Sequence, residues 1–321
     1  MINKIENLLQ GFQSGNKKSL ARFISLIENG NEHNYLLLDK IYAQVGKAIR
    51  IGITGPPGAG KSTIINCLTK RYRHLGKTVG IIAIDPTSPF TGGALLGDRI
   101  RMNELASDEG VFIRSMATRG SSGGLALRTH EVADLLDAFG FDIIFLETIG
   151  VGQAELDIVD AADSIVVVLV PESGDAIQAM KAGLMEIADI FVVNKADREG
   201  ADRAALQIQQ ALEFCNHNFD WKPPVLSMVA NQGKGINLLE QNLEEHANYL
   251  ASHHRRQNMK KNRIEKYLRQ IINEKLVEKI WQPALKKKME GQIDKIKQKK
   301  KSPYAAGQQI VKELLRNKIK N

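Results

Sequence analysis

An α/β fold with a mostly parallel, doubly wound sheet is predicted by two patterns in this sequence of 321 residues. Short aliphatic runs of strand length alternate with amphipathic segments of helical length between residues 47 and 250. The runs are apolar almost throughout, which is typical of parallel strands that helices cover on both faces. Right-handed crossovers then place the ligand-binding loops at the carboxyl ends of the strands.

Seven runs rich in β-branched and aromatic residues are the expected strands. They are Ile51–Thr54, Val79–Ile84, Val111–Arg114, Ile143–Glu147, Ile165–Val170, Phe191–Val193 and Val225–Ser227. Amphipathic segments separate them, notably 131–139 and 177–188.

Three regions are expected: an N-terminal helical extension over 1–46, the α/β domain over 47–250 and a C-terminal helical arm over 251–321. The arm carries an apolar stripe from Ile264 to Trp281. Pro283 should kink or restart its helix, and Ser302-Pro303 is typical of a helix start. Since the arm is too small for its own core, its stripe should pack on the α/β domain or on a second copy. A homodimer is the preferred interpretation.

The net charge of +8 is unevenly distributed. Residues 255–321 contain 21 Lys and Arg against 6 Asp and Glu. A solvated helical face is preferred over nucleic-acid binding, because no aromatic residues interleave with the two Lys-rich runs. The sequence shows no run of 18 apolar residues and no signal-peptide core, and Cys67 and Cys215 have no metal or redox spacing. We therefore expect a cytoplasmic protein without a membrane partner.

A phosphate-binding loop follows the first predicted strand. Residues 55–62 read Gly-Pro-Pro-Gly-Ala-Gly-Lys-Ser, which fits G-x-x-x-x-G-K-[ST] at every fixed position. Its glycines let successive backbone N–H groups turn toward phosphates, Lys61 would reach the β- and γ-phosphates, and the Ser62 hydroxyl would bind Mg²⁺. The expected nucleotide-binding residues here are Gly55, Pro56, Pro57, Gly58, Ala59, Gly60, Lys61, Ser62 and Thr63.

A guanine-reading motif follows the sixth predicted strand: residues 194–197 read Asn-Lys-Ala-Asp. The Asp197 carboxylate can accept from the N1–H and the N2 amino group of guanine, and adenine offers neither donor. A buried partner left unpaired discriminates by roughly 10⁴ or more. Together the two motifs predict a P-loop GTPase (G) domain that binds GTP and GDP with Mg²⁺, with Asn194, Lys195 and Asp197 at the base.

Two carboxylates end predicted strands beside the phosphate loop. Asp85 lies before a proline, where a turn-forming role competes with metal binding. Glu147 lies where small switch GTPases carry aspartate, and it can still orient Mg²⁺ through water. Gly150 would let its backbone amide reach the γ-phosphate, so residues 148–155 would respond to hydrolysis.

The chain resembles the methylmalonyl-CoA mutase accessory GTPases (MeaB/ArgK-like), which are chaperones of B12-dependent acyl-CoA mutases. The resemblance rests on residues 52–63, 85–99, 147–155, 171–175 and 194–197. It implies that Lys61, Asp85, Asp98 and Glu147 are the catalytic residues, with Ser62, Asp85, Asp98 and Glu147 at the metal. It also implies switches at 85–102, 147–155 and 171–183. The residues expected to signal nucleotide state to the partner are Gln153, Glu155, Asp175, Gln178 and Lys181.

The sequence departs from that family at the last base-contact element. Where the family carries Ser-Ala, alignment from Pro224 to Ile236 gives Val229-Ala230. The Ala230 amide can still meet the guanine oxygen, whereas Val229 lacks the hydroxyl that braces the loop. No catalytic glutamine or arginine follows from spacing alone, and for Arg114 and Arg119 a structural role is preferred over a phosphate contact.

The function implied by the resemblance is to couple GTP binding and hydrolysis to adenosylcobalamin loading and to protection of a methylmalonyl-CoA-type mutase. Alternatives are a metal-delivery (nickel-type) GTPase, a kinase associated with a transport system, and an RNA-associated module that uses the basic arm. The nickel alternative would want a His-rich or Cys-rich tract, which the sequence does not contain. The kinase alternative would want an element that binds a protein acceptor, and none is apparent.

Overall fold

The computed structural model describes residues 2–29, 34–85, 105, 107–117, 124–148, 160–171, 183–214, 221–252, 255–281 and 283–318. They form two compact units, Met1–Arg263 and Ile264–Asn321. Among these residues no helix combines the length and apolarity needed to cross a membrane.

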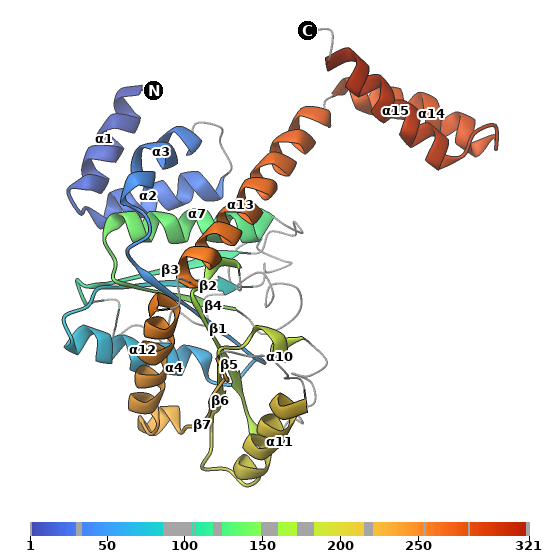
Figure 1. The fold of residues 1–321 in the computed structure, drawn as a ribbon. Coiled ribbons are helices and arrows are strands. Elements are labelled where there is room, and N and C mark those ends of the chain that lie inside the picture. The colour runs from blue at the N-terminus through green and yellow to red at the C-terminus, as the bar shows by residue number, and fades with distance from the viewer. Residues whose placement is uncertain are drawn as a thin grey trace. The chain divides into compact units, whose positions relative to one another are not determined.

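The first unit is built on a parallel sheet of seven strands in the order β3-β2-β4-β1-β5-β6-β7 (Figure 1). The strands are β1 (Ile49–Thr54), β2 (Val79–Asp85), β3 (Val111–Ala117), β4 (Ile143–Glu147), β5 (Ser164–Leu169), β6 (Ile190–Val193) and β7 (Val225–Ser227). All seven predicted strands are confirmed, with ends shifted by three residues at most. The doubly wound α/β prediction is therefore confirmed, and every pairing in the sheet is parallel.

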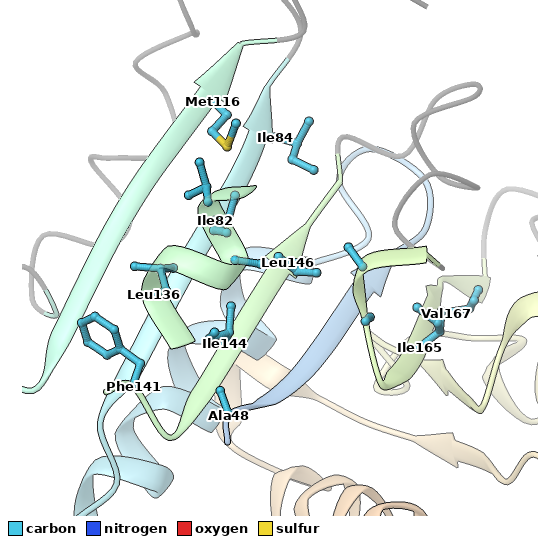
Figure 2. Packing of buried hydrophobic residues seen from close by; sticks show 14 of the residues in the cluster. Ala48, Ile82, Ile84, Met116, Leu136, Phe141, Ile144, Leu146, Ile165 and Val167 are labelled. Carbon is cyan, nitrogen blue, oxygen red and sulfur yellow. The ribbon is translucent and has the colours of Figure 1, made fainter. Parts of the chain in front are cut away.

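Except in β1, whose Ile51 and Ile53 enter one core only, alternate side chains of the strands enter two different cores, one on each face of the sheet. Ile144 and Leu146 of β4 belong to one core, and Ile143 and Phe145 to the other. Figure 2 shows the first core, where Leu136 and Phe141 lie beside Ile82, Ile144 and Leu146. Both faces are covered, so the strands are apolar at nearly every position.

Helices cover both faces of the sheet (Figure 1). On the first core pack α7 (Gly124–Phe139) and α11 (Ala201–Phe214), and on the second α4 (Lys61–His74) and α12 (Ile236–Ser252). The short α10 (Leu184–Ile187) precedes β6, and the 3₁₀ turns η1 (Tyr42–Gln44) and η3 (Ala230–Gln232) precede β1 and α12.

The N-terminal helices extend the first core rather than form one of their own. They are α1 (Ile2–Gln13), α2 (Lys17–Glu28) and α3 (Asn34–Ile41). Phe12 of α1 makes edge-on ring contacts with Phe23 of α2 and Phe139 of α7, at centroid distances of 5.4 and 5.2 Å. The helix α2 begins because the Asn16 side chain accepts from the Lys18 and Ser19 N–H groups. No polar group with a chemical role lies in this contact, which fits a packing function.

The C-terminal helices are α13 (Arg255–Ile280), α14 (Pro283–Lys297) and α15 (Pro303–Lys318). The predicted break at Pro283 is confirmed, and so is the helix start at Ser302-Pro303, where the Ser302 Oγ accepts from the Ala305 N–H at 3.2 Å. In the second unit α14 pairs with α15, and Lys288 lies 3.3 Å from Glu313. The part of α13 that belongs to the second unit carries an apolar residue at every fourth position. These residues are 44% to 54% exposed: Ile264, Leu268, Ile272 and Leu276.

Candidate functional site

The phosphate loop lies between β1 and α4 and depends on three glycines with left-handed backbone angles. Gly55, Gly58 and Gly60 have φ values of 133°, 74° and 96°, which residues with a Cβ rarely adopt. Two of them are also closely packed. A Cβ on Gly55 would lie 2.0 Å from the Val168 carbonyl oxygen, and one on Gly60 would lie 2.3 Å from the Asn194 Nδ2. The loop is thus a glycine turn at the start of a helix, the kind of loop that can present backbone N–H groups to a phosphate.

Lys61 is the first residue of α4 and is buried. Its ammonium group donates to the carbonyl oxygens of Gly55 and Pro56, at 2.7 and 2.9 Å. These bonds hold the cation over the loop, close to where the phosphates would be bound. The predicted position of Lys61 on the cradle agrees with this geometry.

Ser62 and Glu147 come together from different elements. The Ser62 hydroxyl donates to the Glu147 Oε1 at 2.6 Å, and the Glu147 side chain is buried. Glu147 ends β4, where it pairs in register with Ile53 of β1 and Ala83 of β2. Two of the four predicted metal ligands are therefore adjacent at the carboxyl edge of the sheet. A hydroxyl and a carboxylate are oxygen donors of the kind that Mg²⁺ prefers.

Asp85 ends β2, two residues after Ala83, so its backbone lies at the same edge. Its side chain is outside the described residues, and so is all of Asp98. The described residues include no cluster of three or more His, Cys, Asp and Glu side chains suited to a metal ion. Ser62 and Glu147 are thus the described part of the predicted metal site.

Two threonines that the motif analysis did not single out join the strand ends under the loop. The Thr54 Oγ1 accepts from the Thr148 Oγ1 at 2.8 Å, and both side chains are buried. The Thr148 N–H also donates to the Ile53 carbonyl at 3.2 Å. These bonds connect the residue before Gly55 with the residue after Glu147. The available signal was a threonine at the end of one apolar strand and another directly after a second.

The predicted base-reading motif is held against the phosphate loop by Asn194. Its Nδ2 donates to the Ala59 carbonyl at 2.7 Å, and its Oδ1 accepts from the Ala230 N–H at 3.1 Å. Asn194 therefore ties together the phosphate loop, the end of β6 and the loop after β7. Lys195 has a left-handed φ of 58°, and Asp197 is exposed in the following turn.

The loop after β7 is a short hairpin. Val229 and Lys234 exchange both backbone hydrogen bonds, at 3.1 and 3.2 Å. Ala230 begins the 3₁₀ turn η3, and its carbonyl accepts from the Gly233 N–H at 3.1 Å. The Ala230 N–H, expected to meet a guanine oxygen, donates to Asn194, so a guanine oxygen would share this N–H or displace the amide.

Arg114 belongs to a packing contact. Its guanidinium donates to the Ser25 hydroxyl at 3.2 Å and forms an ion pair with Glu28, so it fastens β3 to α2. The structural role preferred for it is confirmed. The remaining predicted residues lie outside the described part of the chain: Gly150, Gln153, Glu155, Asp175, Gln178 and Lys181, as well as Arg119.

The opposite, amino-terminal edge of the sheet carries a buried polar network centred on Arg50. Its guanidinium contacts Asp134 and Asp137 of α7 at 2.7 and 3.0 Å. Burial raises the pKa of Asp134 even though Arg50 acts to lower it. Asp163 accepts from the Arg50 N–H and from Arg263 of α13, both at 3.0 Å. Within the first unit, this network joins Arg263 of α13 to Asp163, which directly precedes β5.

A Ser-His-Asp set lies at the same edge but is closed to substrate. His246 of α12 has Nδ1 2.8 Å from the Ser164 Oγ and Nε2 3.4 Å from the Asp189 Oδ1. Ser164 and His246 are buried, and the Trp221 ring packs on the imidazole at 4.8 Å. Burial raises the pKa of Asp189 to about 7 and lowers the pKa of His246 to about 4. The set is a packing network rather than a nucleophilic site.

A glycine loop at a helix start and the predicted guanine-reading motif, joined to it by Asn194 on a parallel doubly wound sheet, are the features of a P-loop GTPase. The model of the family "Methylmalonyl Co-A mutase-associated GTPase MeaB" matches residues 20–284. The chain belongs to this family of GTP hydrolases, and the predicted resemblance is confirmed.

Relatives with known names agree with this assignment. A protein of Pyrococcus abyssi named provisionally as a GTPase is 48% identical over 314 residues, which are 97% of each chain. The GTPase ArgK of Escherichia coli (strain K12) is 34% identical over 287 residues, 86% of this chain and 87% of that one. The crystal structure of an LAO/AO transport system kinase matches with a TM-score of 0.74 and 26% identity over 98% of both chains.

Proposed function

We propose that this GTPase is a chaperone that couples GTP binding and hydrolysis to adenosylcobalamin loading and protection of a methylmalonyl-CoA-type mutase. The family match over residues 20–284 supports the mutase as the partner. The observation that carries the coupling is the hydrogen bond between Ser62 and Glu147. It joins the phosphate-loop helix to the end of β4, where the proposed second switch (residues 147–155) begins.

The residues of the site fit GTP and Mg²⁺. The glycine cradle and Lys61 would hold the phosphates, and Asn194, Lys195 and Asp197 would hold the base, with Val229 and Ala230 beside it. Mg²⁺ would be held by Ser62, with Glu147, Asp85 and Asp98 around it, directly or through water. The bound ion would neutralise phosphate charge. Because Ser62 and Glu147 contact each other directly, metal binding would replace or lengthen their 2.6 Å hydrogen bond.

The signal to the mutase would pass through the segments after the strand ends. Loss of the γ-phosphate would release residues 85–102 and 147–155, with Gly150 as the backbone contact. Gln153, Glu155, Asp175, Gln178 and Lys181 would report that change to the partner. The bond between Thr54 and Thr148 supports this route, because it fixes the start of the second switch to the phosphate loop.

A homodimer through the second unit is part of the proposal. The apolar stripe of α13 leaves four large aliphatic side chains 44% to 54% exposed in the described chain. Burying them in a second copy would contribute roughly 1 to 2 kcal/mol each. The basic side chains of α14 and α15 would remain on the solvated surface.

The alternatives have less support. The matching crystal structure is that of a transport system kinase, but the sequence has no apparent element that would bind a protein acceptor. A metal-delivery role has no metal-binding cluster in the described part of the chain to support it. An RNA-associated role would use the basic arm, and salt-dependent retention on RNA would favour it.

The decisive experiment measures complex formation between the purified protein and a candidate mutase with GDP and with a non-hydrolysable GTP analogue. We expect different affinities and different rates of adenosylcobalamin transfer in the two nucleotide states. Identical affinity and identical transfer would reject the coupling. Analytical ultracentrifugation of the same preparation tests the dimer, and replacing Leu268 by Gln should shift it toward monomer.

A further inference from the structure

The carbonyl of Ala230 is held from two sides. It accepts from the Gly233 N–H within its own turn, at 3.1 Å, and it lies 3.4 Å from the Cys67 Sγ of α4. The N–H of the same residue is held by Asn194. Val229 and Ala230 have no polar side-chain atom, so neither of them can brace the loop through a side-chain hydrogen bond.

Cys67 comes from the helix that carries the phosphate-binding residues. It lies six positions after Lys61 in α4, and its side chain is partly buried against the second core. Burial raises the pKa of the thiol, against an opposing effect of Lys70, so the group stays protonated at neutral pH. A protonated thiol is a weak donor that can reach a carbonyl oxygen at this distance.

We propose that Cys67 is a positioning residue for guanine-nucleotide binding, whose thiol donates to the Ala230 carbonyl and braces the loop after β7. The inference rests on the proposed role of that loop in contacting the base. The Cys67 thiol, which comes from α4, would take the place of the hydroxyl that Val229 lacks. It also links the loop to the helix that begins at Lys61, so the base and phosphate parts of the site share one support.

Two substitutions separate a brace from simple packing. Cys67→Val keeps an apolar side chain of similar size and removes the donor, whereas Cys67→Ser keeps a donor and removes apolar contact. The full chain would be titrated with ribose-labelled GDP. Inorganic tripolyphosphate, which has no base, would be the competitor that reports the phosphate loop alone. Thermal unfolding of each variant reports packing.

We expect Cys67→Val to weaken GDP binding about three-fold, which corresponds to the lower range of a single neutral hydrogen bond. Cys67→Ser should bind GDP more tightly than Cys67→Val, and tripolyphosphate should bind all three proteins equally. The proposal is overturned if Cys67→Val binds GDP like the wild type, if Cys67→Ser is the weaker variant, or if tripolyphosphate and GDP lose affinity together. If one of the two variants does not fold, GDP binding is compared between the remaining variant and the wild type.

The wild-type titration tests the underlying site separately. If GDP binds no more tightly than ADP, the loop after β7 and Asp197 do not read guanine, and the brace falls with them. If guanine is preferred and the variants match the wild type, only the role of Cys67 is lost.

Discussion

The hydroxyl of Ser62 donates to the carboxylate of Glu147 at 2.6 Å, although the two residues are 85 positions apart. The contact exists because β1 and β4 are neighbours in the sheet, with Ile53 beside Glu147. The helix after β1 and the end of β4 therefore meet at one point.

Replacing Glu147 by Gln should lower the rate of GTP hydrolysis by roughly 10- to 100-fold, the range expected for a residue that orients a metal site. The amide keeps the shape of the side chain and can still accept from Ser62, but it lacks the negative charge that attracts Mg²⁺. Steady-state hydrolysis at several Mg²⁺ concentrations measures the effect, and excess Mg²⁺ should recover part of it. Unchanged hydrolysis at limiting Mg²⁺ would show that Glu147 has no role at the metal.

Gly60→Ala should abolish tight nucleotide binding, with an affinity loss of at least about ten-fold. Its Cβ would lie 2.3 Å from the Asn194 Nδ2, at a φ of 96°, and would break the bond between Asn194 and Ala59. Gly58→Ala is the matched control, because its φ of 74° is also left-handed but no atom lies within 4 Å of the added Cβ. Gly58→Ala should therefore lose only the binding free energy that backbone strain costs, about 1 kcal/mol. Equal losses in calorimetric titrations would contradict a role for the Asn194 contact.

Arg50→Gln should lower the free energy of unfolding by about 3 kcal/mol. The guanidinium is only 4% exposed and faces both Asp134 and Asp137, so its removal leaves buried carboxylates without their cation. Lys222→Gln is the surface control, because Lys222 and Glu213 lie 3.9 Å apart and are 74% and 67% exposed. It should change stability by less than about 0.5 kcal/mol. Urea unfolding measures the free energy of unfolding of both variants. Equal values for Arg50→Gln and Lys222→Gln would show that the buried network does not stabilise the fold.

The pair of Asp189 and His246 should keep stability nearly independent of pH between about 4 and 6.5. The folded pKa of Asp189 is raised from 3.8 to about 7, so its contribution is complete below pH 4 and is lost as the pH rises. The folded pKa of His246 is lowered from 6.5 to about 4, so its contribution is complete above pH 6.5 and is lost as the pH falls. The two slopes have opposite signs and offset each other in this window.

Removing one partner should therefore expose the slope of the other. In Asp189→Asn, the free energy of unfolding should rise with pH between 4 and 6.5. In His246→Gln it should fall over the same window, in both cases by roughly 1 kcal/mol per pH unit. Denaturant midpoints across this pH range provide the measurement. Parallel profiles for the wild type and both variants would show that these groups titrate normally.

The strands and the two motifs could be predicted from the sequence because both depend on local chemistry. Apolar runs such as Ile143–Glu147 have almost no polar position that could face water, so they predicted buried strands whatever their neighbours. The phosphate loop needs glycines at fixed spacing, and Gly55 and Gly60 have the left-handed angles that this spacing implies. The helix start at Ser302-Pro303 was predicted for the same reason, since its cap is made by residues within one turn.

The contacts between distant segments were decided only by the tertiary structure. No sequence spacing indicates that Asn194 bonds to both Ala59 and Ala230, that Cys67 reaches the Ala230 carbonyl, or that Arg114 pairs with Glu28. Each requires the order in which strands lie side by side and the face on which each helix packs. Local propensity fixes which residues form an element, whereas the burial of two opposite apolar faces fixes which elements meet. The side chains that meet across them follow from that second step.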